Sequence, residues 1–175
     1  MERIGDWIQV YSGRPFWPLD PRAEEVEIED IAQALSLKCR YGGHCLRFYS
    51  VAEHSVLVSQ HVAPEHALWA LLHDAGEAYL ADVPRPVKPS LAGWKALEDG
   101  IMRAVCDRFG LPHAEPGEVK RVDFAITTDE KAALMAEGPA WTGLLPPIGA
   151  RIEGLPPMEA RAAFMARFEE LRHES

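Results

Sequence analysis

The stretch LLHDAGEAYLADVPRPVK, residues 71–88, decides how the centre of this chain folds. Its apolar residues recur with a helical period, and Pro64 upstream suits the first turn of a helix. We therefore predict a helix from Pro64 to about Leu80, ended by Pro84 and Pro86 because proline cannot continue a helix. A histidine and acidic residues interrupt the middle of this apolar pattern, and their presence needs an explanation.

A helical wheel separates two faces of the predicted helix. At about 100° per residue, one face is an apolar stripe for the core, formed by Leu68, Leu71, Leu72, Ala75 and Tyr79. His73, Asp74 and Glu77 lie on the opposite face, which carries small alanines and no Lys or Arg. A solvated surface explains a bare His-Asp pair, whereas a polar face without long side chains favours a site that another helix approaches. Both explanations stay open from this segment alone.

Two more polar residues interrupt the apolar faces of predicted helices. His54 lies within SVAEHSVLV and Asp123 within EVKRVDFAI. A lone histidine there is more often a hydrogen-bonded core residue, but an unpaired carboxylate is costly to bury, and a cation would compensate it. Imidazole and carboxylate groups are the usual ligands of divalent ions that promote hydrolysis. These residues are therefore candidate metal ligands.

The order of four motifs, SVAEHS, HDAGE, ADVPRPVK and VKRVD, resembles the HD-domain phosphohydrolase superfamily. Within that superfamily the chain is most similar to the small 5'-deoxynucleotidases and related deoxynucleotide phosphohydrolases of bacteria and phages. The resemblance covers residues 28–136 and implies an all-α fold, a single HD-domain helical bundle. It also implies a divalent metal ion, with Mn, Co, Mg, Zn, Ni and Fe all open, whose ligands would be His54, His73, Asp74 and Asp123.

The resemblance also assigns roles to residues around the metal. Glu77 would orient or deprotonate the attacking water, and Asp82 would assist it. The family's basic, phosphate-holding positions correspond to Arg40, Lys88 and Lys120. Tyr41 stands where the nucleotidases usually have a tryptophan beside the nucleoside, so the preference for base and sugar stays open.

The expected function is metal-dependent hydrolysis of a deoxynucleotide, first of all as a 5'-deoxynucleotidase that releases phosphate from dNMPs. One alternative is a dNTP triphosphohydrolase of the phage kind, including a dATP-selective one. The other alternative is a regulatory protein that binds nucleotide without turning it over. Its signature would be the loss of a metal ligand or of Glu77, and none of these residues is lost.

The remaining segments complete one predicted domain that spans residues 1–175. Residues 7–22 lack a helical period and predict an extended or short-hairpin lead-in. Ser50 can cap a helix over residues 51–62 together with Glu53. Gly110 ends a predicted helix over residues 90–110, and Pro116 opens one over residues 115–138. Two further predicted helices span residues 24–39 and 158–173, and Pro/Gly-rich residues 138–157 form a surface loop.

Composition narrows the partners and the compartment. The chain has 175 residues, 47% of them hydrophobic, which is enough for one domain with a core. Its net charge of −9 disfavours duplex nucleic acid, and no apolar run approaches the ~20 residues of a membrane span. Three cysteines and the absence of a signal-peptide pattern indicate a cytoplasmic protein with reduced thiols. A structural zinc at Cys39, His44 and Cys45 is the less favoured alternative for two of these cysteines.

Aromatic residues of the lead-in bear on oligomeric state. Trp7, Tyr11, Phe16 and Trp17 are suited either to an interface between copies of the chain or to burial over the domain's own core. Relatives within the resembled family are commonly dimers or larger. We therefore expect a homo-oligomer.

Overall fold

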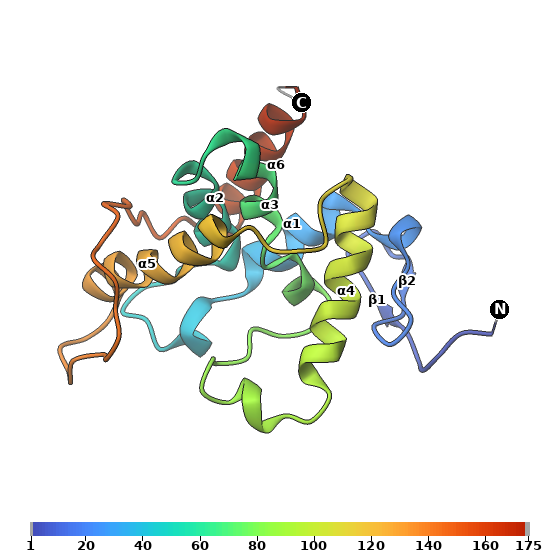
Figure 1. Ribbon diagram of the computed structural model, residues 1–175, viewed down its shortest axis with the longest axis horizontal. Helices are drawn as coiled ribbons and strands as arrows, with labels where there is room; N and C mark the ends of the chain where they lie inside the picture. The colour runs from blue at the N-terminus through green and yellow to red at the C-terminus, as the bar shows by residue number, and fades with distance from the viewer. Residues whose placement is uncertain (1, 174–175) are drawn as a thin grey trace.

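Helices form most of residues 2–173, the part of the chain that the computed structural model describes (Figure 1). The α-helices are α1 (Ile28–Leu37), α2 (Val51–Gln60), α3 (Pro64–Leu72), α4 (Trp94–Phe109), α5 (Gly117–Leu134) and α6 (Pro157–His173). Short 3-10 helices are η1 (Ala23–Glu25), η2 (Arg40–Gly43), η3 (Ala75–Ala78) and η4 (Lys88–Ser90). A small antiparallel hairpin pairs β1 (Ile8–Gln9) with β2 (Pro15–Phe16). The predicted all-α class is confirmed.

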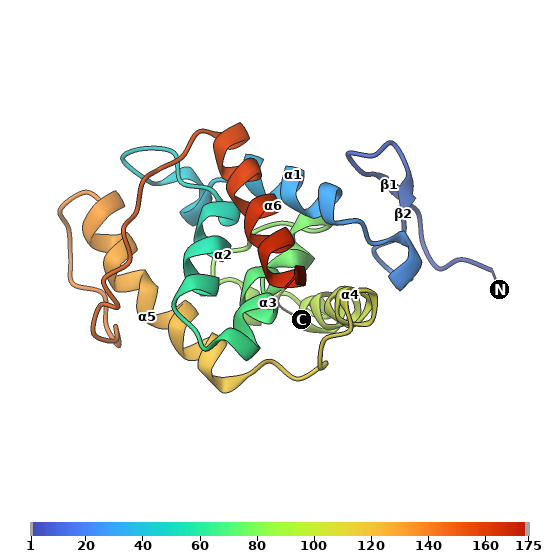
Figure 2. The same cartoon turned by 90° about the horizontal axis from the view of Figure 1, so that it is seen from above.

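The core lies where α1, α2, α3 and α6 pack together. Figures 1 and 2 show these helices at the centre, with α5 on one side and α4 and the hairpin on the other. Their buried apolar side chains include Ile31, Leu35, Val51, Leu71, Leu72, Phe164 and Phe168. Because α2 also packs against α5, one side of the buried α2 faces that outer helix. This arrangement brings His54 of α2 next to residues of α5.

Local capping signals set several helix ends as predicted. The Ser50 hydroxyl accepts a hydrogen bond from the Glu53 backbone N–H at 3.1 Å, which caps α2. Gly110 ends α4 with a φ of 70°, a left-handed conformation that glycine adopts without strain. Pro116 directly precedes α5. The first predicted helix is shorter than expected, because residues 24–39 divide into η1 and α1.

The helix predicted from Pro64 to Leu80 is wrong in its second half. It ends at Leu72, and the chain then turns into η3. The His73 ring donates from Nδ1 to the Ala70 carbonyl at 2.7 Å, and this carbonyl is the one to which the Asp74 N–H would donate in a continued helix. Lys38 from the end of α1 donates to the Glu77 and Leu80 carbonyls, and so stabilises the irregular segment. His73 and Asp74 therefore lie at a helix end and not on a helix face.

The N-terminal lead-in forms the predicted hairpin and packs partly on the core. Phe16 is fully buried and stacks on Tyr79 with ring centroids 3.9 Å apart. Ser12 donates to the buried Asp30 carboxylate of α1 through its backbone N–H at 2.6 Å and its hydroxyl at 3.0 Å. Trp7 and Tyr11 remain exposed. Burial on the domain's own core therefore accounts for Phe16, one of the four aromatic residues of the lead-in. The homo-oligomer stays a prediction.

The Pro/Gly-rich segment between α5 and α6 is an ordered loop held by two carboxylates. Glu53 of α2 accepts from the backbone N–H groups of residues 153, 154 and 155 at 2.8, 3.0 and 2.7 Å. Asp129 of α5 accepts from the N–H groups of Ile148 and Gly149 at 2.9 and 3.1 Å. The loop thereby fixes α5 and α6 relative to α2. Within residues 2–173, no helix is both long and apolar enough to cross a membrane.

Candidate metal centre

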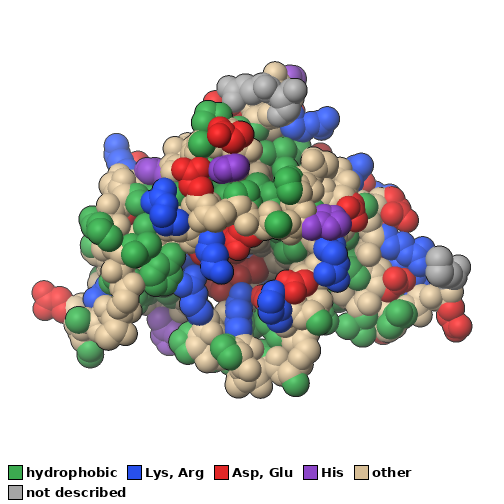
Figure 3. Space-filling view, in the orientation of Figure 1, with side chains coloured by type: hydrophobic (Ala, Val, Ile, Leu, Met, Phe, Trp, Pro, Cys, Tyr) green, Lys and Arg blue, Asp and Glu red, His purple; other side chains and the backbone are tan. Residues whose placement is uncertain are grey.

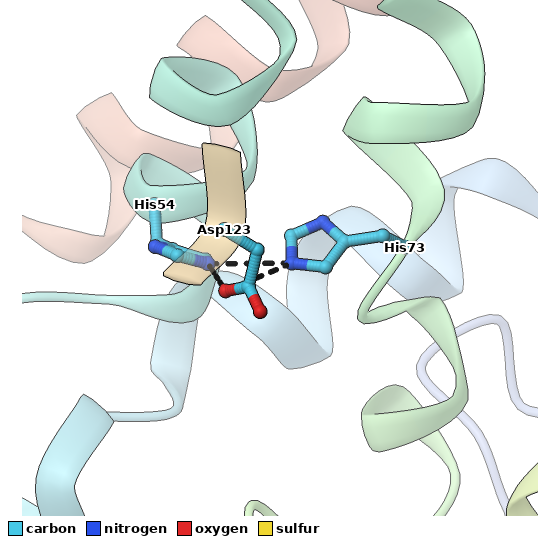
Figure 4. A group of neighbouring side chains, drawn as sticks. All are labelled: His54, His73 and Asp123. Carbon is cyan, nitrogen blue, oxygen red and sulfur yellow. Dashed lines mark hydrogen bonds and ion pairs between the residues drawn. The ribbon is translucent and has the colours of Figure 1, made fainter. Parts of the chain in front are cut away.

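Two histidines and an aspartate from three segments converge beside the core (Figure 4). His54 comes from α2, His73 follows α3, and Asp123 comes from α5. One ligand atom of each lies within 4.8 Å of the other two, and His54 Nε2 is 3.3 Å from His73 Nε2 and 3.2 Å from Asp123 Oδ1. Among the residues that the structure describes, this is the one such group of three or more His, Cys, Asp or Glu side chains. It contains three of the four predicted metal ligands.

The hydrogen bonds of the two rings determine which nitrogens face the centre. His54 Nδ1 is 2.7 Å from a Glu130 carboxylate oxygen, and His73 Nδ1 is 2.7 Å from the Ala70 carbonyl oxygen. Both partners accept only, so both Nδ1 atoms carry a proton and both Nε2 atoms face each other and Asp123; in a neutral ring Nε2 would be a bare lone pair. Lone pairs of two Nε2 atoms and a carboxylate oxygen repel one another at these distances. A proton or a metal ion between them would therefore stabilise the arrangement. Although burial lowers the pKa of His73, Asp74 and Asp123 raise it well above its ordinary value.

Asp74, the fourth predicted ligand, borders the same group. Its Oδ2 lies 3.3 Å from His73 Nε2 and 3.8 Å from His54 Nε2. The same oxygen is 3.5 Å from Arg40 Nη1, so the guanidinium of Arg40 shares this carboxylate with the histidines. Burial opposes ionisation of Asp74, but the two histidines outweigh it and hold the pKa of Asp74 below its ordinary value.

Glu130 is a buried residue of this centre that the sequence analysis missed. Its side chain is 0% exposed, and its Oε1 accepts from His54 Nδ1 and, at 2.9 Å, from the Tyr49 hydroxyl. The other oxygen accepts from the Tyr41 hydroxyl and from Arg40 Nη2 at 3.3 Å. Burial raises the pKa of Glu130, but Arg40 and His54 outweigh burial and lower it to about 2, so the carboxylate is ionised. Glu130 follows Asp123 by seven residues, two turns of α5, and this spacing was the available signal.

A pocket of about 400 Å³ opens beside the metal-ligand group. His73, Asp74 and Asp123 line it, together with Lys88 and with residues of α4 that include Lys95, Glu98 and Asp99. Its apolar lining consists of Trp69, Gly76, Leu80, Ala81 and Met102. Figure 3 shows a hollow in this face with acidic side chains at its floor and Lys and Arg side chains around its rim. This charge pattern suits an anionic group that reaches a cation at the floor.

Glu77 lines this pocket as the sequence analysis predicted, although it belongs to η3 and not to a continued helix. Burial, followed by the nearby Asp74 and Asp82 carboxylates, raises the pKa of Glu77 to about 9. Its Oε1 is 3.8 Å from Lys88 Nζ, and Lys88 also donates to Glu98 of α4 at 2.8 Å. Lys88 is half-buried at the pocket wall, where the carboxylates of Glu77 and Glu98 position its ammonium group.

Arg40 and Tyr41 lie on the Glu130 side of the metal-ligand group. Arg40 bridges Asp74 and Glu130, and its guanidinium carbon is 5.5 Å from the centre of the Tyr41 ring. Tyr41 adopts a φ of 56°, a left-handed conformation that costs a non-glycine residue about 1–2 kcal/mol. Its ring lies 5.8 Å from that of Trp141 in the loop between α5 and α6. In this structure both predicted substrate-binding side chains contact the protein's own groups.

Three other charged residues surround the metal-ligand group and the pocket. Asp82 is half-buried, and its negative charge acts to raise the pKa of Glu77 and that of Lys38. Burial raises the pKa of Glu115, which lines the pocket, and the positive charge of Lys120, exposed on α5, opposes this. Arg85, which the sequence analysis did not single out, places Nη2 3.4 Å from Asp123 Oδ2 while its side chain is 63% exposed. Arg85 thus brings an additional cation to the solvent side of Asp123.

Two proteins are similar to this chain over nearly their whole length. The uncharacterized protein YfdR of Escherichia coli (strain K12) is 37% identical over 169 residues, which cover 94% of this chain and 95% of YfdR. The uncharacterized protein RCAP_rcc00048 of Rhodobacter capsulatus is 38% identical over an alignment of 182 positions, which includes 92% of this chain and 93% of that protein. No family model matches the sequence. Neither relative's name states an activity.

Proposed function

We propose that this chain, which belongs to the same family as the Escherichia coli protein YfdR, is a metal-dependent phosphohydrolase of the HD-domain type. The observation that carries the proposal is the convergence of two imidazole Nε2 atoms and a carboxylate within 4.8 Å, with both Nδ1 atoms already bonded to acceptors. Metal-binding histidines show this pattern, in which the second ring nitrogen donates to a carboxylate or a carbonyl. The four motifs that resemble HD-domain enzymes supply the reaction class.

The donor set fits a divalent transition metal. Two neutral imidazoles and a carboxylate suit Mn, Co, Ni, Fe or Zn, and His54, His73 and Asp123 would hold the ion with Asp74 as the fourth ligand. When bound, such an ion supplies Lewis-acid assistance to hydrolysis at a phosphate. The buried Glu130 would keep the His54 ring in the orientation that directs Nε2 to the centre.

Glu77 is the proposed proton acceptor. Its buried carboxylate lies in the pocket wall beside the ligand group, and a pKa of about 9 would keep it protonated at neutral pH in the absence of a cation. A nearby divalent cation favours the ionised form of a carboxylate and would lower that pKa. Glu77 could then orient a water molecule and take its proton, with Asp82 close enough to modulate it electrostatically.

Cations around the pocket would bind the phosphate. Lys88 lines the wall next to Glu77, and Arg85 lies on the solvent side of Asp123. Arg40 contacts Asp74 from the opposite side. These cations explain how a chain with a net charge of −9 could bind an anion. The pocket volume of about 400 Å³ and its apolar lining are of the size and kind that accommodate a small ligand such as a nucleoside.

The proposed substrate is a deoxynucleoside 5'-monophosphate, with phosphate as the released product. A deoxynucleoside triphosphate is the second candidate, and one observation favours it. Lys95 lines the same pocket as Lys88 but stands further out on α4, where its side chain is 85% exposed. Lys95 could therefore contact phosphates beyond the first. A regulatory protein without turnover is less well supported, because the metal ligands and Glu77 are all present.

Incubation of the purified protein with Mn²⁺, Co²⁺ or Mg²⁺ and a panel of dNMPs, dNTPs and their ribonucleotide counterparts tests the proposal. A 5'-deoxynucleotidase releases orthophosphate and a nucleoside from dNMPs, whereas a triphosphohydrolase releases tripolyphosphate and a nucleoside from dNTPs. Glu77→Gln, assayed in parallel, separates this activity from a contaminating phosphatase. Equal activity of the Glu77→Gln preparation, or no turnover of any member of the panel, would overturn the assignment.

A further inference from the structure

The two oxygens of the Glu130 carboxylate serve two different parts of the molecule. Oε1 accepts from His54 Nδ1, on the far side of the ring from the metal-ligand group. Oε2 accepts from the Tyr41 hydroxyl and from Arg40, the first two residues of the η2 turn, Arg40–Gly43. One buried side chain therefore connects a candidate metal ligand with the turn that carries two candidate substrate-binding residues.

From this arrangement we infer that Glu130 is a positioning residue that couples metal binding at His54 to the conformation of the η2 turn. The inference rests on the metal centre of the proposed function but on no particular substrate. A cation at His54 Nε2 requires the proton to stay on Nδ1, which in turn requires Glu130 as its acceptor. Tyr41 and Arg40 hold the other carboxylate oxygen, so displacement of the turn would loosen that acceptor.

Two observations on the η2 turn support the coupling. Tyr41 has a φ of 56°, a conformation that persists in a non-glycine residue only when its surroundings hold it, and its hydroxyl bond to Glu130 is one such constraint. Arg40 contacts Asp74 at 3.5 Å as well as Glu130 at 3.3 Å, so the turn reaches the metal-ligand group by a second route. Linkage requires that any effect of the turn on metal affinity equals the effect of metal on the turn.

The test measures metal affinity and motion of the turn without any substrate. Metal-free protein is titrated with Co²⁺ and followed by its visible absorption, and hydrogen exchange of residues 39–46 is measured with and without Co²⁺. Glu130→Gln keeps the shape of the side chain but replaces one accepting oxygen by a donating NH2 group, and Tyr41→Phe removes only the hydroxyl. His44→Ala, at an exposed side chain directly after the turn, is the matched control.

We expect Glu130→Gln to weaken Co²⁺ binding about 10- to 100-fold, the usual cost of losing a partner of a metal-binding histidine. Tyr41→Phe should weaken it about fivefold, at the lower end of measured couplings between sites, and His44→Ala should leave it unchanged. Co²⁺ should slow exchange in the turn of the wild-type protein and do so less in Tyr41→Phe. Urea unfolding of the metal-free proteins separates these effects from lost stability.

The outcomes distinguish failure of the coupling from failure of the metal centre. Wild-type protein that does not bind Co²⁺ would overturn both. Wild-type affinity in Glu130→Gln, or Co²⁺ binding with no change of exchange in residues 39–46, would overturn the coupling and leave the metal centre standing. If Glu130→Gln does not fold, Tyr41→Phe decides, and wild-type affinity in that variant contradicts the inference.

Discussion

The two histidines of the candidate metal centre lie in opposite kinds of surroundings. His54 is in the middle of α2 and is fully buried, and α5 contacts both of its ring nitrogens through Asp123 and Glu130. His73 lies just past the end of α3, lines the pocket, and bonds to the carbonyl of the preceding turn. Tertiary packing thus positions one ligand, and a local break in a helix positions the other.

The difference shows how one centre combines rigidity with access. The His54 side chain is fully buried and has the Glu130 carboxylate behind it, so it would hold an ion in place. On the His73 side, the end of the helix places Asp74 and Glu77 at an open pocket instead of inside a helix bundle. We therefore expect changes on the His54 side to affect stability and metal together, and changes on the other side to affect metal or turnover alone.

The largest effect is expected for His54→Ala compared with Asp74→Ala. Both variants should lose retained metal and activity. His54→Ala should also lower the free energy of unfolding by about 3–5 kcal/mol, because it removes one of the hydrogen-bond donors to the buried Glu130 carboxylate and leaves a cavity beside the core. Asp74→Ala should cost about 1 kcal/mol or less, because its side chain is 21% exposed and borders the pocket. Metal analysis of the purified variants and urea unfolding measure the two quantities.

His61→Ala is the control for that comparison, since it removes a half-buried histidine directly after α2 that bonds to the Leu57 carbonyl. It should keep metal and activity. Stoichiometric metal in Asp74→Ala would remove Asp74 from the ligand set. Equal destabilisation by His54→Ala and Asp74→Ala would contradict the contrast between the two sides.

The next effect in size is expected for Glu77→Gln, on the open side. This variant should retain metal and bind substrate as the wild type does, because Glu77 is not among the converging ligand atoms. Its kcat should fall about 100-fold or more, which is typical when a general base is removed. Metal content, KM and kcat under one buffer condition test this. A wild-type kcat in this variant would show that Glu77 is not the general base.

The same contrast explains which features could be predicted from the sequence. The helix over residues 51–60 and the end of α4 depend on local signals, the hydroxyl of Ser50 and the left-handed Gly110, and both were predictable. The end of α3 was not, because it depends on the His73 ring and on Lys38, which comes from a helix far away in the sequence. Propensity within the segment alone favours a longer helix.

The candidate site shows a similar division. His54 and Asp123 were found because a polar residue in an apolar segment is unusual, and this signal is local. Glu130 stands after two threonines and an aspartate and looks like a solvated residue, although its spacing from Asp123 places both on one face of α5. Its partners Tyr41 and Tyr49 come from another part of the chain, so only the tertiary structure reveals its burial.

The smallest effects are expected for the cations, in an order set by burial. Lys88→Ala should lower kcat/KM about tenfold, because Lys88 is half-buried in the pocket wall and already oriented by Glu98. Arg85→Ala should lower it about threefold, and added salt should reduce that difference, because an exposed charge is screened. Lys120→Ala should have no measurable effect, because its exposed side chain is one step further from the ligands, beside Glu115.

Steady-state kinetics of these variants at low and high ionic strength, with a monophosphate and a triphosphate substrate, test this order of kcat/KM values. A triphosphohydrolase requires Lys88→Ala to weaken dNTP use more than dNMP use, since more phosphate charge then depends on the pocket cations. A Lys120→Ala defect equal to that of Lys88→Ala would make Lys120 a phosphate-binding residue, as its position in the family pattern implies. It would also mean that the binding surface extends along α5 beyond the pocket that Lys88 lines.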